Sequence, residues 1–221
     1  MRENEMTNDE IERGLLWANL CQWGNYSKLK FQIDHNDMER QLEQFKDNWV
    51  PYHSTKGIAN RWGLPITNDT GILSDTSGLQ SLNVKENSYG AGLTEDQYTV
   101  KTPVYHAIPS VAKVVDQFDP DIGRVHFLKI DAGGYFPMHK DFPGPTPEYF
   151  RLLVVFGKVK PENYGHILHD QLFYPDPGFM YFVNFQLNHA VFSFTDSVYC
   201  MILTVKLNQR TYDIIRNNLM V

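Results

Sequence analysis

The sequence predicts a mainly β protein of the α+β kind, a barrel or sandwich flanked by helices at its amino-terminal end. Three observations predict this class. The 221 residues are 42% hydrophobic, enough for one sizeable core. Clusters rich in Gly and Pro at 132–134, 143–145 and 175–178 predict turns. Between and around them lie seven short β-rich runs: Arg124–Ile130, Tyr135–His139, Arg151–Phe156, His166–Tyr174, Phe179–Phe185, His189–Phe194 and Val198–Leu207.

The first half of the chain predicts helices and loops. Thr7 and Glu10 form a capping-box pattern before a helix that reaches about Trp23, and a second helix is expected over 36–49. Residues 51–103 predict short strands and long loops, 110–118 a short helix, and 209–219 a closing helix. We therefore expect an extension over 1–109 that packs on and caps a β core over 110–221, the two forming a single compact unit.

Composition excludes several classes of protein. The net charge is -6 and no segment gathers Lys and Arg, which argues against nucleic acid as a partner. The two cysteines, Cys21 and Cys200, make no disulfide framework and fit a reducing compartment. The sequence starts without a signal-like segment, and no apolar run approaches the roughly 20 residues that span a bilayer. We expect a cytoplasmic protein without a membrane partner.

One pattern indicates a metal site. His139 and Asp141 flank a single residue, so at the end of a strand both side chains leave the same face and can reach one ion. His189 opens a later β run and can supply a third ligand. Two imidazoles and one carboxylate on one face of an octahedral ion leave the opposite face open, which suits iron(II) that must bind a cosubstrate and dioxygen. A structural zinc site would be closed and usually rich in thiolates.

The other histidines and motifs give weaker evidence of a functional site. His166 and His169 lie three apart on an expected strand and so point to opposite faces. His35, His53, His106 and His126 have no ligand-spaced carboxylate beside them that suggests a site. The sequence has neither a Ser-His-Asp order with a strained elbow nor a glycine-rich phosphate loop.

Three polar residues are candidates for binding a dicarboxylate cosubstrate, because a carboxylate inside a barrel needs a partner. Arg151 begins an apolar run, an unusual place for a guanidinium unless it faces a partner inside the barrel. Tyr199 and Asn184 lie within apolar strands and can donate hydrogen bonds into a cavity, although such residues more often belong to the core.

The run 127–141, FLKIDAGGYFPMHKD, resembles the aspartyl/asparaginyl β-hydroxylase group of 2-oxoglutarate oxygenases. Arg151–Val155 is similar to that group's Arg-Leu strand, and His189–Val191 to its distal His-Ser-Val. The resemblance covers roughly residues 120–207. It implies a double-stranded β-helix (a jelly-roll, cupin-like barrel) that uses Fe(II), 2-oxoglutarate and dioxygen and releases succinate and carbon dioxide. His139, Asp141 and His189 would be the ligands, and the product a hydroxylated amino-acid side chain, peptidyl or free.

The chain departs from this family at one position. Members commonly carry an Arg about ten residues beyond the distal His to bind the far carboxylate, and Tyr199 stands there. Either Arg151 replaces it, helped by the Tyr199 hydroxyl, or the cosubstrate binds differently, or turnover has been lost. The alternatives are therefore a cupin-like barrel that binds a metal or small ligand without oxidative turnover, and an interaction protein whose three ligand candidates lie apart.

Overall fold

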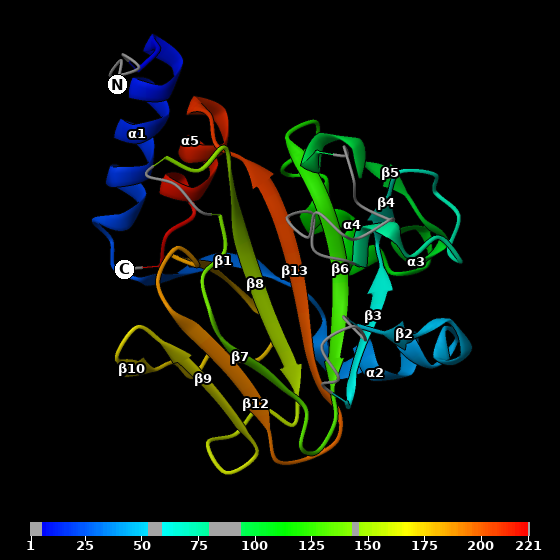
Figure 1. The fold of residues 1–221 in the computed structure, drawn as a ribbon. Coiled ribbons are helices and arrows are strands. Elements are labelled where there is room, and N and C mark those ends of the chain that lie inside the picture. Colours follow the sequence, from blue (N-terminus) through cyan, green and yellow to red (C-terminus); the bar gives the residue numbers. More distant parts are fainter. Residues whose placement is uncertain (1–5, 53–58, 80–93, 143–145, 221) are drawn as a thin grey trace, which may run out of the picture.

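The computed structural model of the chain describes residues 6–52, 59–79, 94–142 and 146–220, which form two facing β-sheets, a separate two-stranded sheet of β4 and β5, and helices packed outside the facing sheets (Figure 1). The α-helices are α1 (Asn8–Cys21), α2 (His35–Glu43), α3 (Pro103–Ala107), α4 (Pro109–Val115) and α5 (Gln209–Asn217). The strands are β1 (Tyr26–Gln32), β2 (Val50–Pro51), β3 (Arg61–Pro65), β4 (Thr67–Asn68), β5 (Val100–Lys101), β6 (Ile122–Ile130), β7 (Tyr135–His139), β8 (Tyr149–Gly157), β9 (Tyr164–Leu168), β10 (Gln171–Leu172), β11 (Phe179–Val183), β12 (His189–Ser193) and β13 (Val198–Lys206).

Strands β6 to β13 form the predicted double-stranded β-helix. The chain passes repeatedly between a large sheet, ordered β1-β11-β8-β13-β6-β3-β2, and a small sheet, ordered β10-β9-β12-β7. All of these strand pairs are antiparallel. Each of the seven expected β runs contains a strand, and one expectation needs correction. The run 166–174 is two strands rather than one, because His169 adopts a positive φ of 59° at the turn between β9 and β10.

The amino-terminal segment contributes strands to the large sheet. β1 pairs with β11 at one edge, while β3 pairs with β6 at the other edge and β2 follows it. Sequence analysis did not predict β1 because only its pairing with β11 distinguishes this mixed polar and apolar run from a loop. The first helix begins with the predicted capping box of Thr7 and Glu10. The second ends at Glu43, earlier than expected, and a 3-10 turn at Lys46–Asn48 follows it.

The large sheet separates two hydrophobic cores. The helix-side core lies between this sheet and the helices, and the inter-sheet core lies between the two sheets. Along β13, Tyr199, Met201 and Leu203 belong to the helix-side core, whereas Val198 and Cys200 belong to the inter-sheet core. This alternation follows from the two-residue period of a strand. Among the described residues, no helix is both long and apolar enough to cross a membrane.

Candidate metal centre

The fold brings His139, Asp141 and His189 together. His139 ends β7, Asp141 follows two residues later, and His189 begins the neighbouring strand β12 directly opposite His139. One ligand atom from each residue lies within 4.8 Å of the others. Nε2 of His139 is 3.6 Å from Oδ1 of Asp141, and Nε2 of His189 is 3.8 Å from its Oδ2. The three residues that the sequence suggested as ligands therefore converge on one point.

Backbone carbonyls orient both imidazoles. Nδ1 of His139 lies 2.6 Å from the Pro137 carbonyl oxygen, and Nδ1 of His189 lies 3.0 Å from that of Leu187. A carbonyl only accepts, so each Nδ1 carries the hydrogen and each Nε2 keeps its lone pair. Both lone pairs belong to the nitrogens that face the Asp141 carboxylate. This is the outer support that metal-binding histidines usually have.

The electrostatics favour the protonation states that metal binding requires. Burial lowers the pKa of His189 to about 4, which leaves its imidazole neutral near pH 7. Burial by itself raises the pKa of Asp141, but the positive charge of Arg151 and the nearby imidazoles outweigh burial, and the pKa falls below its usual value. A neutral imidazole and an ionised carboxylate are the forms that bind a cation.

Arg151 touches the candidate ligand set directly. It lies on β8 and donates a hydrogen bond from Nη1 to Oδ2 of Asp141. Its guanidinium also lies over the ring of Phe142, with Cζ 5.0 Å from the ring centroid. Both carboxylate and guanidinium are mostly buried, so the pair fixes the direction of the Asp141 side chain.

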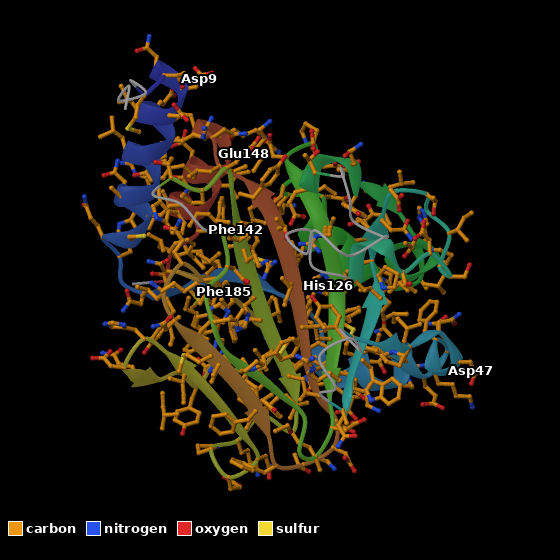
Figure 2. The ribbon with its side chains drawn as sticks, in the orientation of Figure 1. Asp9, Asp47, His126, Phe142, Glu148 and Phe185 are labelled. Atoms are coloured by element: carbon orange, nitrogen blue, oxygen red, sulfur yellow. The ribbon has the colours of Figure 1, made fainter. Side chains whose placement is uncertain are left out.

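The three ligand candidates line a cavity of about 610 Å³. Its wall is about equally polar and apolar and comes from both sheets and from the loops at their ends. The apolar part includes Phe136, Phe142, Tyr164, Phe185 and Ile202. Figure 2 shows the side chains on the ribbon and labels Phe142, Glu148 and Phe185 of this lining. The volume suits a small organic ligand beside a metal ion.

A buried ion pair lies in the same wall. Arg124 on β6 donates to Glu95 through Nε at 2.8 Å and through Nη2 at 2.6 Å, and its Nη1 donates to the Gly78 carbonyl at 3.2 Å. Both side chains are less than one-tenth exposed. The pair joins the segment before β5 to the large sheet. It was not predicted, because Glu95 falls in the stretch expected to form loops.

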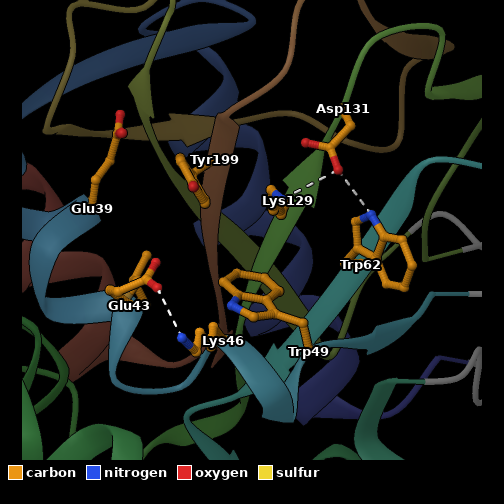
Figure 3. Close-up of a pocket in the computed structure, with 9 residues that line it drawn as sticks. Glu39, Glu43, Lys46, Trp49, Trp62, Lys129, Asp131 and Tyr199 are labelled. Carbon is orange, nitrogen blue, oxygen red and sulfur yellow. Dashed lines mark hydrogen bonds and ion pairs between the residues drawn. The ribbon is translucent and has the colours of Figure 1, made fainter.

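The other predicted cosubstrate residues lie away from this cavity. Tyr199 belongs to the helix-side core, where its ring stacks on Phe156 at 5.1 Å. It lines a separate cavity of about 270 Å³ together with Trp49 and Trp62 (Figure 3). Asn184 donates from Nδ2 to Cys21 Sγ at 3.4 Å and accepts at Oδ1 from the Gln186 backbone. Neither residue is part of the lining around His139, Asp141 and His189.

His166 and His169 lie in different environments, as their spacing on a strand predicts. His166 is buried and lines the large cavity, while His169 is exposed on the turn between β9 and β10. Burial lowers the pKa of His166 to about 3, so this residue stays neutral. Its Nδ1 lies 3.3 Å from the Tyr164 hydroxyl. His166 and His169 therefore form no second chelating pair.

Arg61 lines the cavity although no pattern in the sequence predicts a role for it. It begins β3, lines the cavity and is only 4% exposed. The sequence around it, Asn60-Arg61-Trp62, carries no motif, so only the pairing of β3 with β6 reveals where this side chain lies.

The similarity of this chain to known proteins is found in its structure and not in its sequence. No protein-family model matches the sequence, and no curated protein matches it. Among solved structures, an oxidoreductase of the 2OG-Fe(II) oxygenase family from Burkholderia pseudomallei has 13% identity and a TM-score of 0.45, covering 94% of each chain. The viral collagen prolyl hydroxylase of Paramecium Bursaria Chlorella virus-1 has 12% identity and a TM-score of 0.49, covering 84% of this chain and 97% of its own.

A Pseudomonas putida prolyl-4-hydroxylase has 10% identity and a TM-score of 0.48, covering 87% of this chain and 100% of its own.

Proposed function

We propose that this protein is an Fe(II)- and 2-oxoglutarate-dependent dioxygenase that hydroxylates an amino-acid side chain, in a peptide or as the free amino acid. The observation that carries this proposal is the convergence of two Nε2 atoms and one carboxylate in the wall of a cavity. This donor set fits iron(II), because three ligands on one face leave room for other molecules on the opposite face. The resemblance of 127–141 to the aspartyl/asparaginyl β-hydroxylase group supports the choice of an amino-acid substrate.

His139, Asp141 and His189 would hold the ion. When bound, iron(II) supplies the redox chemistry that couples 2-oxoglutarate, dioxygen and a C–H bond to succinate, carbon dioxide and an alcohol. The chain's own residues position the reactants. Arg151 keeps the Asp141 carboxylate ionised and oriented. The Pro137 and Leu187 carbonyls fix the imidazole rings.

Aromatic side chains in the cavity wall would limit the access of water to the ion. Phe185 packs against His189 with ring centroids 4.7 Å apart, and Phe142 lies beside Arg151. A dry, shaped site protects reactive species from side reactions and strengthens the electrostatic contacts inside it. The remaining volume of the cavity would hold the substrate, whose identity would be set by the loops that line it.

A direct test is to titrate 2-oxoglutarate into anaerobic, iron(II)-loaded protein and to follow the visible absorption that a chelating 2-oxo acid gives with such iron. Metal-free protein and His139→Ala serve as controls. A saturable band that is absent from both controls supports the proposal. Iron binding without an absorption band overturns the assignment of 2-oxoglutarate as the cosubstrate. Failure to bind iron overturns the whole proposal.

A second candidate is a cupin-like barrel that binds a metal or a small ligand without oxidative turnover. The position of Tyr199 favours it, because the residue that stands where the resemblance implies an arginine points into the helix-side core. Succinate formation separates the two candidates. Iron-loaded protein that consumes dioxygen and 2-oxoglutarate to yield succinate is a dioxygenase, and protein that binds both without succinate is not.

A further inference from the structure

Arg61 is a buried cation that has no ion-pair partner in the part of the chain that the structure describes. The side chain belongs to a residue only 4% exposed, and its Nε and Nη2 make no hydrogen bond with any described residue. Burial lowers the pKa of the guanidinium, yet an arginine stays charged under all ordinary conditions. An unpaired buried charge is strongly unfavourable. Such a residue is therefore expected to meet an anion that comes from outside the chain.

Four arginines line the cavity: Arg13 of α1, which is only partly buried, and Arg61, Arg124 and Arg151 of the large sheet. Arg124 is paired with Glu95, and Arg151 is paired with Asp141. Arg61 has no ion pair among the described residues, and its Cζ lies 4.4 Å from the ring centroid of Phe136. A cation over an aromatic face gains some stabilisation, but less than a carboxylate would supply.

The free atoms of Arg61 form one edge of the guanidinium. Nε and Nη2 are the two donors with which Arg124 binds both oxygens of Glu95. On Arg61 the same two donors are unused. Two parallel N–H groups on one edge match the two oxygens of a carboxylate. The unoccupied edge thus specifies a carboxylate more closely than a single positive charge would.

The position of Arg61 relative to the metal ligands fits a short dicarboxylate. Arg61 lies opposite Ile130 of β6, whose side chain belongs to the inter-sheet core. Phe136, which contacts the guanidinium, and His139 lie opposite Val191 and His189 of β12, with a register shift between them, so they are about two residue rises, or roughly 7 Å, apart along the strand. A five-carbon chain with a metal bond at one end and hydrogen bonds at the other covers a distance of this order.

We propose that Arg61 binds the far carboxylate of 2-oxoglutarate through Nε and Nη2, while the 2-oxo acid end of the molecule lies at the metal. This inference rests on the proposed function. From the sequence, Arg151 on β8 and Tyr199 on β13 were expected to bind the far carboxylate. The inference assigns this role to Arg61 on β3, a strand outside the eight that form the barrel. Arg151 then acts on Asp141 and needs no contact with the cosubstrate.

The test compares two ligands that differ only at the far end. 2-Oxopentanoate has the same five carbons as 2-oxoglutarate and a methyl group in place of the far carboxylate. The dissociation constants of both ligands are measured anaerobically with iron(II)-loaded wild type, Arg61→Gln, Arg61→Lys and Arg40→Gln. Arg40 is an exposed arginine of α2 paired with Asp37, so its variant controls for the loss of one positive charge.

We expect Arg61→Gln to weaken 2-oxoglutarate binding about 10- to 100-fold, because charge-assisted hydrogen bonds are lost. Arg61→Lys should lie between that variant and wild type. Binding of 2-oxopentanoate and of iron should be the same in all four proteins. Equal 2-oxoglutarate affinity in wild type and Arg61→Gln overturns the role of Arg61 and leaves the proposed function standing. If wild type binds neither ligand, the proposed function itself falls, and this inference with it.

A measurement without ligand distinguishes binding from a structural role. Arg61→Met replaces an unpaired buried cation by an apolar side chain of similar length. We expect the midpoint of thermal unfolding of ligand-free protein to stay the same or rise, because the cost of the buried charge disappears. A clear fall in the midpoint, together with a fall in binding, would mean that Arg61 supports the fold rather than the cosubstrate.

Discussion

Arg151 on the large sheet donates a hydrogen bond to Asp141, which follows a strand of the small sheet, so one ion pair joins the two walls of the cavity at the candidate metal centre. A bound cation would share the Asp141 carboxylate with this guanidinium. The pair therefore links metal binding to the stability of the barrel, and this link can be measured.

Arg151→Ala should destabilise the metal-free protein. Removing the guanidinium leaves the mostly buried Asp141 carboxylate without its strongest partner. The cost should be about 2 kcal/mol in the free energy of unfolding, less than the roughly 3–5 kcal/mol of a fully buried pair, because the two side chains remain 18% and 16% exposed. Chemical denaturation measures it. Adding a divalent metal should restore more stability to the variant than to wild type, and an equal gain in both would contradict the link.

His189→Ala should abolish iron binding. Loss of an outer partner of a metal ligand alone costs about 10- to 100-fold in affinity, so loss of the ligand itself should exceed roughly 100-fold. Metal content after anaerobic loading and dialysis is the measurement. His169→Ala is the matched control, because His169 is exposed on the turn that follows β9. Iron retained in the His189 variant would remove this residue from the site.

Glu95→Ala should be among the more destabilising single substitutions. It removes the carboxylate partner of the buried Arg124, which costs about 3–5 kcal/mol for a pair of this kind. Glu43→Ala breaks an exposed contact with Lys46 at 3.6 Å and should cost less than about 1 kcal/mol. Denaturant unfolding of both variants gives the comparison. Similar losses of unfolding free energy in the two variants would mean that the buried pair stabilises the fold no more than the exposed pair does.

The Cys200 thiol should make stability depend on pH in the alkaline range. Burial raises its pKa to about 12 in the folded protein, against about 8.5 for an unfolded cysteine. The folded state therefore keeps a proton that the unfolded state releases. The contribution is fully present below about pH 8 and is lost as the pH rises toward 12, with a limiting slope of about 1.4 kcal/mol per pH unit.

The change in unfolding free energy between pH 8 and pH 10 tests this relation. In Cys200→Ala it should be smaller than in wild type, whatever the absolute stability of the variant. Cys21, whose pKa burial raises to about 11, contributes in the same direction and stays in both proteins as an internal reference. Identical pH slopes in the two proteins would show that the Cys200 thiol ionises in the folded state as readily as in the unfolded one.

Local sequence determined most strands, most helices and the candidate ligands. A capping box, runs of β-forming residues and Gly-Pro turns are short-range signals, and the structure confirms helices at α1, α2, α4 and α5 and a strand in each of the seven predicted β runs. The His-x-Asp pair was recognisable because two residues on one strand end share a face. His189 could be added because β12 follows a turn, and its position opposite His139 confirms that the three side chains converge.

Tertiary structure alone decided which side of a strand each polar residue faces and which strands become neighbours. A shift of one residue separates Tyr199 in the helix-side core from Cys200 at the cavity, and no feature of the run itself shows which face is which. Arg61 reaches the cavity only because β3 pairs with β6, far along the chain. Strand pairing at this separation depends on the packing of the whole barrel, which is why the triad could be predicted from the sequence and the unpaired arginine could not.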